Sequence, residues 1–181
     1  MSQTTILTEA LPHLPWQKRP EGCTDVLWRY SGNPVIGWNP TPSAARIYNS
    51  AVVSFGEGFA GVFRADHRTG TSALHVGFSP DGLHWTVSDE PIRWVDEAGT
   101  EYQPRYAYDP RVTRIGDRYY VCWCVDFGGA ALGLGYTDDF QTFVRLENPV
   151  TPFNRNGVLF PRTIGGTYRL LTRPSDSGHT P

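Results

Sequence analysis

Excess charge, long apolar runs and cysteine are all scarce in this sequence. The formal net charge is −2 over 181 residues, so no basic surface for nucleic acid or an anionic membrane is predicted. No run approaches the length of a membrane span, and the first thirty residues lack the apolar core of a signal peptide. We therefore expect a soluble, cytoplasmic protein that binds neither nucleic acid nor membranes.

The 3 cysteines cannot all pair with one another, and their spacing fits no zinc site. Cys122 and Cys124 are two apart in a strand-like run, which places both on one face as small apolar side chains. His67, His75 and His84 match no ligand set either, and we expect them on the surface or on strand faces. The sequence predicts no metal site.

Sustained helical periodicity is also absent, and short β-rich runs bounded by turn residues take its place. The runs are FAGVFRA (59–65), ALHVGFS (73–79), YYVCWCV (119–125) and YRLLTR (168–173). Their regular spacing predicts an all-β sandwich, barrel or propeller. Residues 1–42 contain proline and tryptophan without a clear pattern, and we expect an irregular segment with a strand or two wrapped onto the main body.

An internal repeat favours the propeller. YNSAVVSFGEGFAGVFRAD (48–66) aligns without gaps with YDPRVTRIGDRYYVCWCVD (108–126), and VGFSPDGLHWTVSDEP (76–91) aligns with LGYTDDFQTFVRLENP (134–149). A third copy starts within 158–176. Repeats of about 50–60 residues with roughly four strands each are typical of propeller blades. A β-sandwich with coincidental similarity is the alternative.

The repeats predict one domain over 1–181, with blades at about 43–102 and 103–152 and an incomplete blade at 153–181. A closed propeller typically has about 4–8 blades. We therefore expect a piece of a larger protein, or else a chain that assembles with other chains, which leaves room for a homo-oligomer.

Symmetry of the repeats predicts where a site would form. Equivalent positions near the starts of the innermost strands should meet on the propeller axis. They carry Asn49, Ser50 and Asp109, followed by Asn154, Arg155 and Asn156 just before the third copy, with Arg64 and Arg173 one strand later. One carboxylate, three arginines and several small polar side chains would gather there.

A single acid beside arginines suits general-acid catalysis next to an anion site, because arginine binds phosphate bidentately. An inverting hydrolase usually needs a second carboxylate about 6.5–9.5 Å from the first, and Asp66 and Asp126 are the symmetric candidates. A phosphorolytic enzyme needs cations instead, because phosphate is its nucleophile. The structural alternative is that Asp109 caps a turn and the arginines pair with acids of neighbouring blades.

Five motifs, in this order, resemble glycoside hydrolase family 130, the β-mannoside phosphorylases and related mannosidases. They are RIYNSAVV (46–53), FRADHRTG (63–70), YAYDPRV (106–112), PFNRNGVLFPR (152–162) and LLTRPSDSGHTP (170–181). FNRNGVLFPR and RPSDSGHTP look most like the 4-O-β-D-mannosyl-D-glucose phosphorylase branch. The resemblance implies an all-β, five-bladed β-propeller, of which this chain would be the N-terminal part, about two and a half blades.

The resemblance also implies a role for individual residues. Asp109 matches the family's catalytic acid, whose proton is expected to reach the glycosidic oxygen through the 3-hydroxyl of the mannosyl residue while phosphate attacks with inversion. The mannosyl subsite would be lined by Asn49, Ser50, Arg64, Asp66 and Tyr108, the acceptor side by His179, and the phosphate site by Arg155, Asn156 and Arg173.

The implied products are α-mannose 1-phosphate and a freed sugar, with no metal or organic cofactor and inorganic phosphate as co-substrate. Two other classes stay open. A β-mannoside hydrolase on the same scaffold would need a second axial carboxylate. A non-catalytic carbohydrate-binding propeller would not need the basic pair Arg155 and Arg173, whose presence favours the phosphorylase.

Overall fold

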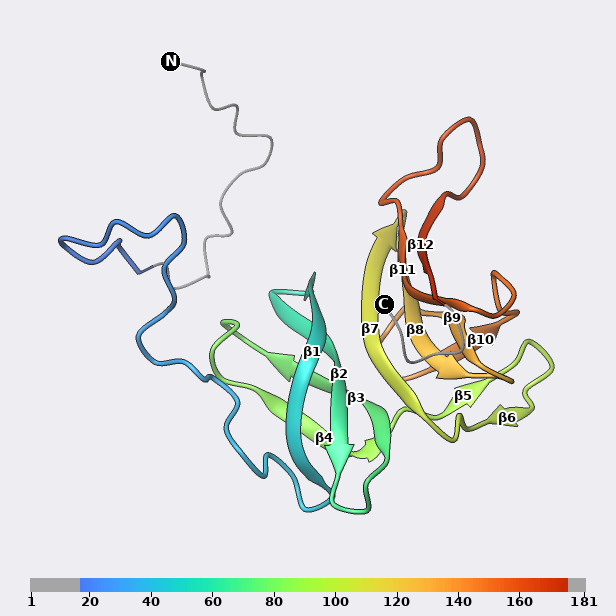
Figure 1. The fold of residues 1–181 in the computed structure, drawn as a ribbon, viewed down its shortest axis with the longest axis horizontal. Coiled ribbons are helices and arrows are strands. Elements are labelled where there is room, and N and C mark those ends of the chain that lie inside the picture. The colour runs from blue at the N-terminus through green and yellow to red at the C-terminus, as the bar shows by residue number, and fades with distance from the viewer. Residues whose placement is uncertain (1–16, 176–181) are drawn as a thin grey trace.

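The computed structural model describes residues 17–175, and every regular element within them is a strand (Figure 1). The first sheet is an antiparallel meander in the order β1-β2-β3-β4. Its strands are β1 (Ala44–Phe55), β2 (Gly58–His67), β3 (Ser72–Ser79) and β4 (Thr86–Pro91). The all-β prediction is confirmed for this part of the chain.

The second sheet repeats the meander with β7 (Ala107–Ile115), β8 (Arg118–Asp126), β9 (Ala130–Thr137) and β10 (Phe143–Leu146). Two short strands, β5 (Trp94–Val95) and β6 (Glu101–Tyr102), extend it in the order β6-β5-β10-β9-β8-β7. β5 and β6 thus pair with the second sheet although they fall within the first predicted repeat. The strands β11 (Asn154–Leu159) and β12 (Leu170–Pro174) form a separate hairpin.

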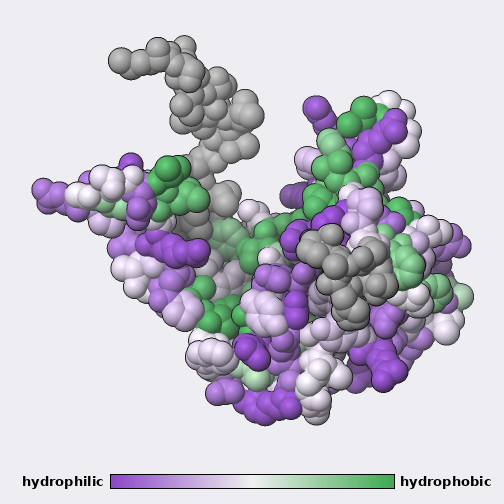
Figure 2. All heavy atoms as spheres, in the orientation of Figure 1, coloured by the Kyte–Doolittle hydropathy of each residue, from purple (hydrophilic) through white to green (hydrophobic). Residues whose placement is uncertain are grey.

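Residues 17–43 form turns and bends without a regular strand. The irregular segment was expected, but the strand or two predicted within it are absent from 17–42. The segment extends away from the first sheet (Figure 1) and exposes Val26, Leu27 and Trp38. In Figure 2 hydrophobic side chains are visible on this segment and on the projecting β11–β12 hairpin, where Ile164 and Leu171 are exposed.

The hydrophobic core joins the two larger sheets. Val62 and Leu74 enter it from the first sheet, and Val121 and Trp123 enter it from the second. Trp94 of β5 stacks on Trp123 of β8 with ring centroids 4.1 Å apart, so Trp94 packs between these two strands. This shared core fixes β1 and β7 side by side, with β7 also in contact with β2 and β11.

The turn SPDGLHW between β3 and β4 recurs as TDDFQTF between β9 and β10. Ser79 Oγ accepts a hydrogen bond from the Gly82 N–H at 2.8 Å, and Thr137 Oγ1 accepts the same bond from Phe140 at 2.8 Å. Asp81 and Asp139 each accept two backbone N–H groups of their own turn. The repeated aspartate is therefore structural, because it holds the backbone of the turn in both sheets.

No helix within residues 17–175 is long and apolar enough to cross a membrane.

Candidate functional site

The innermost strands β1, β7 and β11 share one unusual backbone feature. Asn49, Asp109 and Asn156 have φ angles of 49°, 49° and 54°. Non-glycine residues rarely adopt this left-handed region, and Asn and Asp tolerate it best. Strand pairing shifts register at the same point in each strand, as expected for a β-bulge.

The three bulges place Asn49, Asp109 and Asn156 at equivalent positions of successive sheets. The sequence repeat already pairs Asn49 with Asp109. It places Asn156 just before the third copy, whereas the backbone makes Asn156 the third member of the set. The asparagine ahead of a β-rich run was a signal that could have identified Asn156 as the third equivalent residue. The repeat alignment missed it because the third repeat follows the second at a shorter spacing than the second follows the first.

Asp109 is held by donors from the first sheet. Its Oδ1 accepts hydrogen bonds from Asn49 Nδ2 at 2.9 Å and from Arg64 Nη1 at 2.9 Å. The Arg64 and Asp109 side chains are each 15% exposed, so this ion pair between β2 and β7 is largely shielded from water. Both donors use Oδ1, and no donor from residues 17–175 reaches Oδ2, which leaves that oxygen available to a substrate.

Arg64 is the centre of a larger network. Its Nε donates to Asp66 Oδ1 at 3.1 Å and its Nη2 donates to Tyr48 Oη at 3.0 Å. The guanidinium lies over the Tyr48 ring, 4.4 Å from its centroid, and 5.4 Å from the centroid of Tyr108. All three nitrogen groups of this guanidinium are therefore engaged, which fixes its orientation.

Both carboxylate oxygens of Asp66 accept hydrogen bonds. It accepts hydrogen bonds from Ser72 at 2.6 Å, from the Tyr48 hydroxyl and from Arg64. Burial acts to raise its pKa, but the hydrogen bonds from these three donors outweigh burial and hold the pKa below its usual value. Asp66 therefore stays ionised and serves to orient Arg64 and Tyr48.

The β11–β12 hairpin carries a second group of cations. Arg155 and Arg173 are directly opposite one another on neighbouring strands, which puts two like charges on one face. Such pairs are destabilising in a sheet unless an anion compensates them. Within residues 17–175 neither arginine pairs with a carboxylate, and the buried Arg155 Nε has no hydrogen-bond partner. This arrangement is suited to binding an anion.

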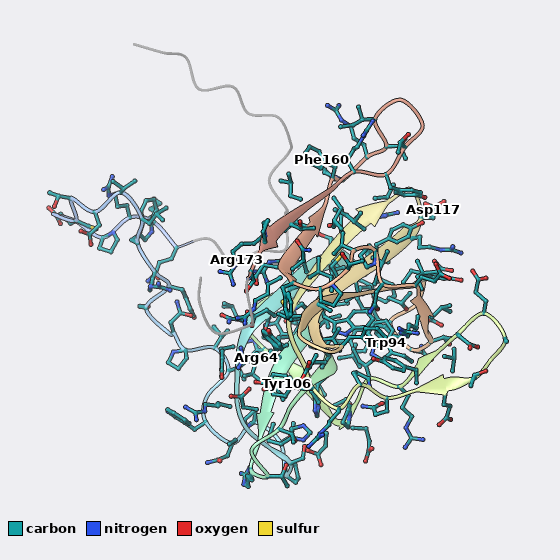
Figure 3. The ribbon with its side chains drawn as sticks, turned by 45° about the vertical axis from the view of Figure 1, so that its right-hand side comes forward. Arg64, Trp94, Tyr106, Asp117, Phe160 and Arg173 are labelled. Atoms are coloured by element: carbon teal, nitrogen blue, oxygen red, sulfur yellow. The ribbon has the colours of Figure 1, made fainter. Side chains whose placement is uncertain are left out.

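The predicted site residues divide into those that the structure joins and those that it does not. Asn49, Arg64, Asp66 and Asp109 form one connected network, with Tyr108 beside it. Figure 3 shows Arg64 and Arg173 at the same flank of the ribbon, with Trp94 among the sheets. Arg155, Asn156 and Arg173 lie together on β11–β12.

One predicted residue among those that the structure describes joins neither group. Ser50 is exposed on β1 beside Asn49, and no contact places it on Asp109. His179 lies outside the described residues.

One neighbour of the site was missed by the sequence prediction. Cys124 on β8 is fully buried and its Sγ hydrogen-bonds to Asn156. Repeat symmetry offered a signal, because the gapless alignment sets Cys124 against Arg64.

The fold and the cluster define a propeller-like all-β protein whose polar site lies where the innermost strands of successive sheets meet. The chain belongs to glycoside hydrolase family 130, because the family model described as beta-1,4-mannooligosaccharide phosphorylase matches residues 8–181. The family assignment confirms the resemblance found in the sequence motifs.

Individual relatives agree with this assignment. The chain is 49% identical over 179 residues to a beta-1,4-mannooligosaccharide phosphorylase of Ruminococcus albus, covering 95% of this chain and 53% of that protein. It is 36% identical over 108 residues to a beta-1,2-mannobiose phosphorylase of Listeria innocua, covering 59% of this chain and 30% of that protein. The chain spans about half the length, or less, of these curated relatives.

A solved structure supports the fold. The beta-1,2-mannobiose phosphorylase of Listeria innocua in complex with beta-1,2-mannobiose superposes with a TM-score of 0.68 at 22% identity, covering 82% of this chain and 58% of that one. At this identity the likeness concerns the arrangement of strands.

Proposed function

We propose that this chain supplies the acid and part of the phosphate site of an inverting β-1,4-mannoside phosphorylase. The observation that carries the proposal is Asp109, clamped through Oδ1 by Arg64 and Asn49, together with the uncompensated cations Arg155 and Arg173 on the hairpin whose strand β11 contacts β7. The name of the Ruminococcus albus relative supports the same substrate class. In this proposal the whole protein is a five-bladed propeller. This chain forms about two and a half of the blades, at 43–102, 103–152 and 153–181, and the remaining blades complete the site.

Asp109 is the general acid in the proposed reaction. With Oδ1 occupied by two donors, Oδ2 is the oxygen that carries the proton when Asp109 acts as the acid. Oδ2 gives this proton to the oxygen of the mannosyl 3-hydroxyl, and the hydroxyl's own proton passes to the glycosidic oxygen. The C1–O bond breaks and the freed sugar leaves with that proton. A phosphate oxygen forms the new bond to C1 from the opposite face, so a β-mannoside yields α-mannose 1-phosphate.

Phosphate is the second substrate and is bound by Arg155, Arg173 and Asn156. An anion between the two arginines would relieve the repulsion that their pairing creates and would give the buried Arg155 Nε a partner. Tyr108, Asn49, Ser50, Arg64 and Asp66 would line the mannosyl subsite, and His179 would face the acceptor. The acceptor identity, the cytoplasmic location and a homo-oligomer stay predictions.

The hydrolase alternative needs a general base, and neither symmetric acid is suited to that role. Every donor around Asp66 stabilises its ionised form, which lowers its basicity. Asp126 is exposed and accepts the Gly129 N–H at 3.0 Å in the turn after β8. Among the described residues, the arrangement therefore favours phosphate over water as the nucleophile.

The test is to incubate the purified protein, at its full natural length, with β-1,4-mannobiose or mannosyl-β-1,4-glucose, with and without inorganic phosphate. We expect α-mannose 1-phosphate only when phosphate is present. Release of free mannose without phosphate would overturn the phosphorylase proposal in favour of the hydrolase. A preference for β-1,4-mannobiose would identify mannose as the acceptor sugar, and a preference for mannosyl-β-1,4-glucose would identify glucose.

The acid is tested by Asp109→Asn, for which we expect a loss of about a hundredfold or more in kcat, within the range of acid catalysis by a side chain. Asp117→Asn is the matched control, because Asp117 is a fully exposed carboxylate in the turn between β7 and β8. Activity of Asp109→Asn equal to that of Asp117→Asn would remove Asp109 from the acid role.

A further inference from the structure

Cys124 occupies in the second sheet the position that Arg64 occupies in the first. Arg64 is the strand partner of Tyr48, and Cys124 is the strand partner of Tyr108. Each of these tyrosines immediately precedes the left-handed residue of its strand. The two positions are therefore equivalent in backbone geometry as well as in the sequence repeat.

Both side chains also make the same kind of link to the next sheet. Arg64 hydrogen-bonds to Asp109, the left-handed residue of β7. Cys124 hydrogen-bonds to Asn156, the left-handed residue of β11. The second strand of each sheet thus holds the bulge residue of the following inner strand, once with a guanidinium and once with a thiol.

The contacts of Cys124 fix the orientation of the Asn156 side chain. The Asn156 backbone N–H donates to Sγ at 3.2 Å, and the thiol S–H points to Asn156 Oδ1 at 3.6 Å. A thiol has one weak donor and weak acceptor capacity, and here both act on one residue. With Oδ1 turned toward the thiol, the amide nitrogen of Asn156 projects away from it, and only the amide nitrogen can donate to an anion.

The thiol has to be protonated for this arrangement. Burial raises the pKa of Cys124 and Asp109 adds to the effect, while the Asn156 N–H and Arg155 act against it. A neutral thiol orients the amide without drawing the anion away from Arg155. A thiolate would repel both Oδ1 and a bound phosphate.

We propose that Cys124 is a positioning residue for the phosphate site, holding Asn156 with its amide nitrogen directed at the anion. The inference rests on the proposed phosphorylase function. It assigns to Cys124 a role in phosphate binding and none in binding the mannoside.

The test compares three variants of the purified full-length protein by steady-state kinetics with phosphate and mannoside varied separately. Cys124→Ala removes the donor, and we expect the KM for phosphate to rise about 3- to 10-fold, the equivalent of one hydrogen bond, with the KM for mannoside within about twofold. Cys124→Ser keeps a donor and an acceptor and is expected to restore most of the phosphate affinity.

Cys122→Ala is the matched control. Cys122 is equally buried on the same face of β8, and its thiol meets the backbone of Leu159 rather than a site residue. We expect the Cys122→Ala protein to keep the wild-type KM for phosphate, which separates positioning from loss of core packing.

Two outcomes would overturn the inference while leaving the proposed function intact. One is an unchanged KM for phosphate in Cys124→Ala, and the other is an equal rise in Cys122→Ala. If the wild-type protein forms no α-mannose 1-phosphate at all, the proposed function fails and the inference falls with it.

Discussion

His75 is a fully buried titratable side chain on β3, and its contacts define its tautomer. Its Nδ1 lies 2.8 Å from the Ser88 carbonyl oxygen, which can only accept, so Nδ1 carries the proton. In the neutral ring Nε2 is then an acceptor, and it receives the hydrogen of His67 Nε2 at 2.7 Å. Protonation of His75 would place two N–H groups against each other.

Stability should therefore fall in mild acid. Burial lowers the pKa of His75, with a smaller contribution from His67, and these outweigh Ser88, Asp89 and Glu90, which act to raise it. Because the folded pKa is below the unfolded value, the unfolded chain takes up a proton first as the pH falls. The stabilisation is present above the unfolded pKa of about 6.5 and is lost progressively as the pH falls from there through the lower pKa of the folded state.

We expect the free energy of unfolding to decline between pH 7 and pH 5 by up to about 1.4 kcal/mol per pH unit from this group. Urea titrations across this range measure the slope, which His75→Gln should flatten. The hydrogen-bonded Asp89, with a pKa lowered to about 2, contributes only at lower pH. A slope of the same size in His75→Gln would assign the effect to another group.

Arg64 is the second residue whose geometry gives a sharp expectation. Lysine keeps the charge but cannot donate in three fixed directions, as Arg64 does to Asp66, Asp109 and Tyr48. We expect Arg64→Lys to lower kcat/KM about 10- to 100-fold, the equivalent of one or two charged hydrogen bonds. Arg114→Lys, at an exposed arginine beside Asp117, is the control and should stay close to wild type. Equal values of kcat/KM for both variants would show that the three directed hydrogen bonds of the Arg64 guanidinium are not needed.

At this scale the sequence predicted the members of the site better than their contacts. The repeat placed Asn49 and Asp109 at one position because they lie in strands that match without gaps. The Arg64–Asp109 ion pair crosses from one sheet to the next, and no local pattern encodes the angle between sheets. The burial of His75 could not be predicted from the sequence either, because a histidine in a strand is compatible with both the buried and the exposed face of the sheet.

At the scale of elements, a glycine recurs on the third strand of each larger sheet. A Cβ built on Gly135 of β9 would lie 2.4 Å from Trp94 Cζ3 and 2.6 Å from the Val144 carbonyl oxygen. At Gly77 of β3 the nearest atom would be the Thr86 carbonyl oxygen at 2.8 Å. The sequence repeat paired these glycines, and the structure gives the reason, since a side chain would push the fourth strand away.

Gly135→Ala is therefore expected to destabilise the protein by about 1–3 kcal/mol, the usual cost of overpacking. Equilibrium unfolding in urea measures the change. Gly37→Ala is the control, because a Cβ there has no atom within 4 Å, and it should change stability by less than about 0.5 kcal/mol. A loss at Gly37 as large as at Gly135 would contradict the packing argument.

At the scale of the molecule, the regularly spaced β-rich runs and the turn residues between them predicted the all-β class, because strand and turn preferences are local. The placement of β5 and β6 could not be predicted in this way. β5 pairs in parallel with β10, and its Trp94 stacks against Trp123 from a distant strand. Long-range contacts of this kind decide which sheet a short strand joins.

Phe140 connects the two larger sheets. Its ring centroid lies 5.1 Å from that of Phe55 in the first sheet and 4.8 Å from that of Tyr119 in the second, and it is almost completely buried. It takes the place of Gly82 in the repeated turn and has a φ of 56°. A bulky residue held in this backbone conformation indicates that its packing outweighs the strain.

Phe140→Ala should therefore weaken both sheets together, by about 3–5 kcal/mol, as for other buried phenylalanines. Because the sheets share one core, unfolding followed by tryptophan fluorescence and by far-UV circular dichroism should give coincident transitions, shifted to lower denaturant with little change in slope. Phe127→Ala, at a side chain 63% exposed, should shift the midpoint far less. If Phe140→Ala separated the two signals into distinct transitions, one sheet would be stable without the other, and the shared core would not act as one cooperative unit.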